Sequence, residues 1–111
     1  MSNLTVIIPA FNEEQSLKVL LPELLDFVKQ NHLQLIIVND GSSDATLEVL
    51  KGFETSANFQ YFSHKVNRGY GGAIKTGIRQ STTKYSITID ADGQHDLNDV
   101  LALQKAILES D

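Results

Sequence analysis

The sequence has 111 residues, a formal net charge of −5 and no cysteine, so disulfides and thiolate metal sites are excluded. Hydrophobic residues make up 41% and charged residues 21%, a composition typical of one folded domain. The negative charge argues against a general nucleic-acid surface. No apolar run approaches the roughly 18 residues of a membrane-spanning helix, and no leader segment precedes the first apolar run, so we expect a cytoplasmic protein.

Strand-like runs alternate four times with helix-like segments along the chain. This alternation predicts an α/β fold of Rossmann-like type with a mainly parallel sheet and four βα units. The strands are expected at residues 5–8, 35–38, 59–63 and 86–89, and the helices that follow them are expected to end near residues 28, 50, 80 and 108.

Several residues predict where these elements begin and end. Pro9 is expected to end the first strand, and Asn12 to cap the first helix with Gln15 three positions later. Pro22 predicts a kink or a restart in that helix. The second helix is expected to be capped by Ser43 or Asp44, the third to begin near Ala73 after a glycine-rich connection, and the last to be capped by Asp96. The last helix should present one apolar face, made by Leu97, Val100, Leu101, Ile107 and Leu108.

A polar cluster directly follows each predicted strand. The clusters span residues 12–14, 39–44, 67–72 and 90–95. Because the carboxyl ends of parallel strands form one edge of a sheet, and ligands bind at that edge, we expect the four clusters to meet in one site.

Two carboxylates, Asp90 and Asp92, stand two positions apart after the last strand, with Gly93 next. A solvated surface turn has the same composition. Carboxylates held together raise each other's pKa unless a cation lies between them. A hard divalent ion, Mg²⁺ or Mn²⁺, suits oxygen ligands and leaves positions open for a phosphate-bearing ligand. Haloacid-dehalogenase-like phosphatases also place DxDG after a strand, but usually with Thr or Ser next, where this chain has Gln94.

Four segments together resemble the glycosyltransferase family 2 enzymes, which have the GT-A fold. They read VIIPAFNEE, IIVNDGSSD, NRGYGGAIKTG and DADGQH, and they cover most of the chain in order. The last segment is most similar to that of the polyprenyl-phosphate sugar transferases. The resemblance implies a parallel sheet in the order 3-2-1-4, with the first and fourth strands adjacent.

The resemblance also implies roles for individual residues. In such enzymes the sheet edge binds a nucleoside-diphosphate sugar, and a divalent ion, Mn²⁺ or Mg²⁺, binds its diphosphate. The donor-binding positions are Pro9, Phe11, Glu13, Asp40, Arg68 and Asp90, and the metal-binding positions are Asp90, Asp92 and Gln94.

Other roles remain open for three of these residues. Glu13 could simply stabilise the positive end of a helix dipole. Asp40 could complete a turn, and Arg68 could be a solvated side chain at the start of a helix.

The function that the resemblance implies is metal-assisted transfer of a sugar, with inversion, from a UDP- or GDP-sugar to a polyprenyl phosphate. Residues 1–111 match the donor-binding half of such a domain, and no residue matches the general base of the acceptor half. We therefore expect the chain alone to be catalytically incomplete, and the alternative is a nucleotide-binding module without transfer activity. A homodimer through the edge of the fourth strand is a further expectation.

Overall fold

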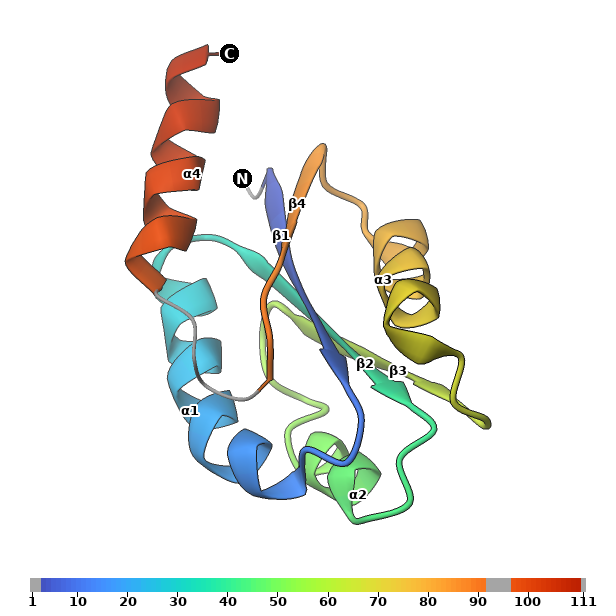
Figure 1. The fold of residues 1–111 in the computed structure, drawn as a ribbon. Helices are drawn as coiled ribbons and strands as arrows, with labels where there is room; N and C mark the ends of the chain where they lie inside the picture. Colours follow the sequence, from blue (N-terminus) through green and yellow to red (C-terminus); the bar gives the residue numbers. More distant parts are fainter. Residues whose placement is uncertain (1–2, 92–96, 111) are drawn as a thin grey trace.

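The computed structural model describes residues 3–91 and 97–110. Strands and helices alternate through these residues without exception (Figure 1). The elements are β1 (Leu4–Ala10), α1 (Glu14–Gln30), β2 (Gln34–Asp40), α2 (Thr46–Lys51), β3 (Phe59–His64), α3 (Gly69–Gln80), β4 (Tyr85–Thr88) and α4 (Leu97–Ser110).

The four strands form one parallel sheet in the order β3-β2-β1-β4. Both the α/β class and the predicted strand order are therefore confirmed. β1 lies between β2 and β4, and its register aligns Ala10 with Asn39 on one side and Ile7 with Thr88 on the other. β4 is an edge strand among the described residues; pairing of two copies through this edge stays a prediction.

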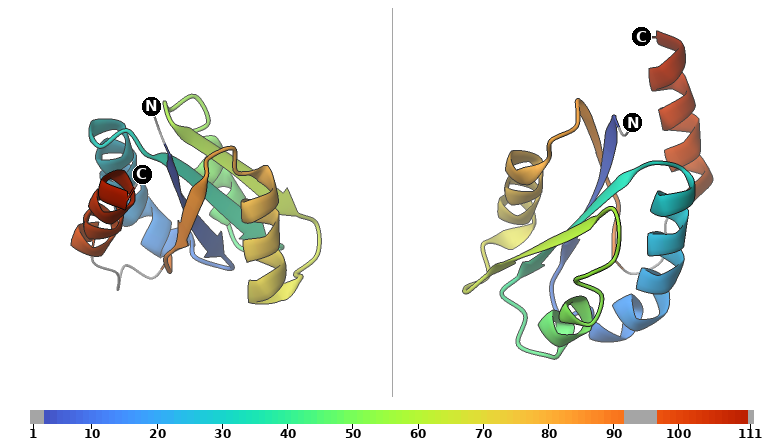
Figure 2. Two further views of the ribbon diagram at one scale, coloured as in Figure 1. Left: turned by 90° about the horizontal axis from the view of Figure 1, so that it is seen from above. Right: turned by 180° about the vertical axis from the view of Figure 1, so that it is seen from behind.

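Alternation of side chains along the strands divides the core between the two faces of the sheet. The larger of the two hydrophobic clusters lies on one face. There, side chains of α1, α2 and α4 pack on alternate residues of β1 and β2, such as Val6, Ile8 and Ile37. α3 packs on the other face, where Ala73 joins Ile36 and Val38 (Figures 1 and 2). α4 is also tied to the end of α1, because the Gln104 side chain donates to the Asn31 carbonyl at 2.8 Å.

Pro9 lies inside β1, so the prediction that it ends this strand was wrong. Between β1 and β4, the Ile7 carbonyl accepts a hydrogen bond from the Ile89 N–H at 3.0 Å. The backbone nitrogen of Pro9, two residues later in β1, points toward the same neighbouring strand. The last pair between β1 and β4 is Ile7 with Thr88. The N–H that proline lacks would therefore point beyond the end of the β4 ladder, where it costs no strand pairing.

The predicted capping of α1 by Asn12 was also wrong. α1 begins after Glu13, without a side-chain cap of its own, and Asn12 has a positive φ of 53°. Its Oδ1 accepts hydrogen bonds from the β2–α2 loop instead, including the Ser43 N–H at 2.8 Å. In return, Thr46 Oγ1 accepts from the Glu13 N–H at 3.1 Å. The segments at the starts of α1 and α2 thus satisfy each other's backbone N–H groups, although about 30 residues separate them in the sequence.

Three further features of the helices differ from those predicted. α1 continues through Pro22 without a restart; Pro22 is exposed, so the carbonyl one turn before it can be solvated. α3 begins at Gly69, so the glycine-rich stretch forms its first turn. On α4, Val100 and Ile107 are buried, whereas Leu108 is 67% exposed and does not belong to the apolar face. The expected cap at Asp96 lies outside the described residues.

No helix within residues 3–91 and 97–110 is both long enough and apolar enough to span a membrane.

Candidate nucleotide site at the carboxyl edge of the sheet

A cavity of about 320 Å³ lies at the carboxyl ends of the strands, which is the lower edge of the sheet in Figure 1. Its lining comes from the carboxyl ends of β1 and β2 and from the segments that follow β1, β3 and β4, as expected for an open parallel sheet. The lining residues are Pro9, Ala10, Phe11, Glu13, Asp40, Asn67, Gly69, Tyr70, Asp90 and Ala91. Five of the six predicted donor-binding residues are brought together here.

The end of β1 and the start of α1 supply one wall of this cavity. Pro9 and Ala10 are the last residues of β1, and their small side chains leave room beside the sheet. Phe11 follows with a 48% exposed ring, a high value for a large apolar side chain that lines a cavity. Glu13 precedes the first turn of α1 and is partly buried.

Asp40 ends β2 and is buried, with only 3% of its surface exposed. Its Oδ1 lies 2.8 Å from His64 Nδ1 and accepts the Arg68 backbone N–H at 2.8 Å. Burial alone would raise the pKa of Asp40, but these hydrogen bonds outweigh burial and hold the pKa below its ordinary value. Asp40 is therefore an ionised acceptor at the back of the cavity.

The β2–α2 and β3–α3 loops meet closely behind Asp40. Gly41 has a φ of +72°, and a Cβ placed on it would lie 2.4 Å from the Asn67 backbone nitrogen. Only glycine fits both the dihedral angle and the space. The Asn67 side chain completes the junction by donating to the Asp40 carbonyl at 3.1 Å. This contact places Asn67 and the residues after it at the cavity.

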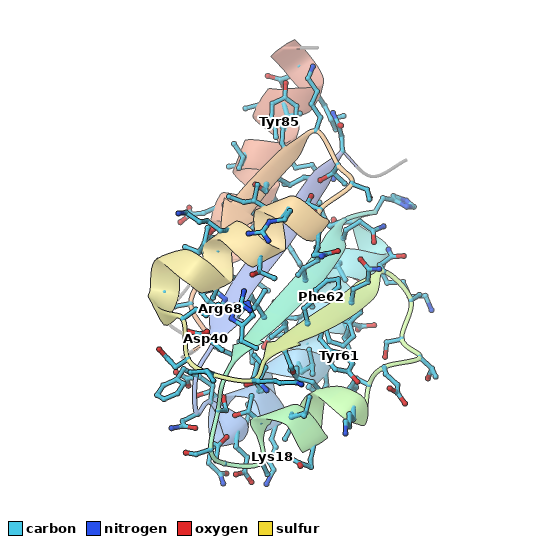
Figure 3. All side chains as sticks on the ribbon, turned by 90° about the vertical axis from the view of Figure 1, so that its right-hand side faces the viewer. Lys18, Asp40, Tyr61, Phe62, Arg68 and Tyr85 are labelled. Carbon is cyan, nitrogen blue, oxygen red and sulfur yellow. The ribbon has the colours of Figure 1, made fainter. Side chains whose placement is uncertain are left out.

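Arg68 contributes its backbone to the site in a way that the sequence did not predict. Its N–H holds Asp40, and Figure 3 shows the two residues together beside the first turn of α3. The Arg68 side chain is not part of the cavity lining, although its neighbours Asn67 and Gly69 are. Arg68 is exposed, so its guanidinium lies on the surface next to the cavity.

The predicted metal site is only partly described. Asp90 follows β4, is exposed and lines the cavity, whereas Asp92 and Gln94 lie outside the described residues. No cluster of three metal-binding side chains occurs within residues 3–91 and 97–110. The Asp90 carboxylate is a hard oxygen donor of the kind that Mg²⁺ and Mn²⁺ prefer, and its position at the cavity rim fits a metal held there.

Four residues gain a specific place in or behind the site; Asn67 and Tyr70 lie in the predicted cluster 67–72 without an individual role, and His64 and Thr76 were not predicted. Tyr70 lines the cavity with a 59% exposed ring, and Asn67 lines it beside Tyr70. His64, which is buried, and Thr76, which is half-buried, form a hydrogen-bonded network behind Asp40. Tyr70 stands in the glycine-rich motif and could have been noticed as an aromatic residue in a binding loop. No local signal in the sequence points to His64 or Thr76.

Comparison of the chain with known proteins identifies its family. The family model described as "Glycosyl transferase family 2" matches residues 5–111. A dolichyl-phosphate β-glucosyltransferase from Dictyostelium discoideum is 35% identical over 106 residues, which cover 86% of this chain and 32% of that protein. The chain thus spans about a third of the length of this curated relative.

Solved structures agree with the sequence comparison. TarS 1–349 of S. aureus in complex with UDP has a TM-score of 0.72 and 25% identity, over 90% of this chain and 31% of that one. The mannosyltransferase PcManGT from Pyrobaculum calidifontis, solved with GDP-Man and Mn²⁺, shares the fold with a TM-score of 0.67, at 23% identity over 81% of this chain and 27% of that one. With the parallel sheet, the cavity at its carboxyl edge and the match over residues 5–111, the chain belongs to glycosyl transferase family 2.

Proposed function

We propose that residues 1–111 are the donor-binding part of a glycosyltransferase that uses a UDP- or GDP-sugar. The observation that carries the proposal is the cavity itself, because it gathers an apolar wall, two exposed aromatic rings, a buried ionised acid and a helix start. The family match and the relatives' names support the proposal over the haloacid-dehalogenase-like alternative.

The nucleoside is proposed to lie between β1 and α3. Phe11 and Tyr70 line the cavity from these two sides and expose 48% and 59% of their surface. Exposed rings of this kind gain contact area when they stack on a nucleobase. Pro9 supports the same wall, while Asp40 and Glu13 can accept hydrogen bonds from a base N–H or from ribose hydroxyls.

The diphosphate is proposed to lie near the start of α3 and the end of β4. The first N–H groups of a helix and its dipole favour an anion, and α3 has no acidic residue in its first turn. Arg68 directly precedes α3, and its guanidinium is proposed to pair with a phosphate. However, Glu13, Asp40 and Asp90 also line the cavity, so three carboxylates would repel the diphosphate unless a cation neutralises it.

That cation is proposed to be Mn²⁺ or Mg²⁺, held by Asp90 with Asp92 and Gln94. When bound, a divalent ion stabilises negative charge on the departing nucleoside diphosphate. The chain's own residues position the donor, so that the face of the anomeric carbon opposite the bond to phosphate is open to an incoming group. Attack from the opposite face would invert the anomeric carbon. A polyprenyl phosphate is the proposed acceptor because of the dolichyl-phosphate relative, and the general base is not assigned.

Calorimetric titration tests this proposal. UDP and GDP are titrated into the chain with Mn²⁺ or with EDTA, and we expect at least one nucleotide to bind more tightly with Mn²⁺. Asp92→Asn should abolish that difference. The matched control is Asp26→Asn, because Asp26 is an exposed carboxylate on α1 outside the cavity.

Two outcomes would count against different parts of the proposal. Binding of equal strength with Mn²⁺ and with EDTA would reject the metal role of Asp90, Asp92 and Gln94. Failure of both nucleotides to bind under either condition would reject the nucleotide site altogether.

A further inference from the structure

His64, the last residue of β3, has a buried imidazole, only 7% exposed, that the proposed function does not use. Its two ring nitrogens contact two different elements. Nδ1 lies 2.8 Å from Asp40 Oδ1 on β2, and Nε2 lies 2.7 Å from Thr76 Oγ1 on α3. The imidazole therefore joins the acid of the cavity to the helix that starts at the cavity.

The proton on Nδ1 is fixed by the chemistry of its partner. An ionised carboxylate can only accept, so Nδ1 carries a hydrogen and donates it to Asp40. Nε2 has two options, because the Thr76 hydroxyl lies 2.7 Å from it and 3.2 Å from the Gly72 carbonyl. A neutral imidazole accepts from Thr76, whereas a charged one donates to Thr76 and frees the hydroxyl for Gly72. The bond to Asp40 is the same in both arrangements.

We propose that His64 is a positioning residue for nucleotide binding. Its Nδ1–H holds the Asp40 carboxylate in the orientation that accepts hydrogen bonds from the nucleoside, and Thr76 holds the imidazole. Asp40 Oδ1 receives donors from His64 and from the Arg68 backbone, so rotation of the carboxylate would break two hydrogen bonds at once. This inference rests on the proposed role of Asp40 in binding the nucleoside.

A purely structural role for His64 is the competing explanation, and two substitutions separate the two. In His64→Asn, the side-chain amide nitrogen can take the place of Nδ1 and donate to Asp40. In His64→Gln, the longer side chain places its amide near Nε2, which keeps the contact with Thr76 and loses the donor to Asp40. Both variants replace the same buried ring with a neutral amide.

The experiment titrates UDP and GDP into the unmodified chain and the two variants in the presence of Mn²⁺, and measures the stability of each in urea. A hydrogen bond to a charged group is worth enough to change affinity by about tenfold or more. We expect His64→Gln to weaken binding by at least about tenfold and His64→Asn by less than about threefold. In an Asp40→Ala background, His64→Gln should cause little further loss. Equal losses in the Asn and Gln variants, or losses that simply follow stability, would overturn the proposal.

A measurement on the unmodified chain covers the case in which a variant does not fold. The Nδ1 proton of His64 should be visible by NMR as a slowly exchanging signal, and its shift should change when UDP or GDP saturates the site. An unchanged signal at saturation would overturn the positioning role while leaving the nucleotide site intact. If the unmodified chain binds neither nucleotide, the proposed function fails first, and this inference fails with it.

Discussion

Gly77, in the last turn of α3, provides a direct test of how this helix is held against the sheet. A Cβ added there would lie 2.5 Å from Ile7 Cγ2, 3.3 Å from Cδ1 and 3.4 Å from Cγ1. Ile7 is fully buried in the inner strand β1, so its branched side chain has no space into which it can move. Gly77→Ala therefore forces overpacking between α3 and β1.

Two opposing terms set the expected size of the effect. Replacing a helical glycine by alanine normally gains about 0.5–1 kcal/mol, whereas overpacking a filled core costs about 1–3 kcal/mol. We expect Gly77→Ala to lower the free energy of unfolding by about 1–2 kcal/mol, since the closest contact is with an immobile side chain.

The matched control for this change is Gly71→Ala, in the first turn of the same helix. Nothing lies within 4 Å of a Cβ at Gly71, and its φ is not positive, so this variant should be neutral or slightly more stable. Urea denaturation with unchanged m-values measures both variants. If Gly77→Ala were as stable as Gly71→Ala, close packing of α3 on β1 could not be what positions the helix.

Other predictions follow from the loops around the cavity. Asn12→Ala removes the side-chain oxygen that accepts hydrogen bonds from the β2–α2 loop. It should lower the free energy of unfolding, measured in urea, by about 1–2 kcal/mol; an unchanged urea midpoint would contradict a stabilising role for these bonds. Gly41→Ala should be more damaging, because a Cβ would meet Asn67 at a positive φ; wild-type stability would refute this close approach. The pKa values of Asp40 and Asp44 are lowered below their ordinary value of 3.8. Both ionised groups therefore stabilise the fold fully above pH 3.8, and this contribution is lost as the pH falls from 3.8 through the lowered pKa values. Unfolding measured between pH 3 and 6 checks this, and stability that rises on acidification would contradict it.

The sequence predicted the fold well because the two inner strands, β1 and β2, are largely apolar on both faces. The runs around Ile7, Ile37 and Ile87 have no helical spacing, and the helix patterns between them leave only a parallel sheet. The strand order followed from the resemblance between motifs. The positions of Phe11, Asp40 and Asp90 at one edge followed from the topology, because each lies at or just beyond the carboxyl end of a strand.

The errors and omissions arose where the partner of a residue is distant in the chain. Asn12 looked like a cap for its own helix, but its partners lie about 30 residues away. Pro9 looked like a strand terminator, because the sequence does not show where the β4 ladder ends. The contact of His64 with Asp40 depends on the register between β2 and β3, which aligns the two residues and which the sequence does not show. Local patterns predict elements, whereas contacts between elements require the assembled structure.

The central claim is that the cavity holds a metal-bound nucleotide, and paramagnetic broadening by Mn²⁺ tests it most directly. Backbone amide signals are recorded for the chain with UDP or GDP, before and after a small addition of Mn²⁺. We predict that Phe11, Gly69 and Ala91, which line the cavity, broaden strongly. Phe53 and Ser56, which line a separate hollow beside α1, should remain sharp. Broadening centred on Phe53 and Ser56, or none at the cavity, would contradict the claim.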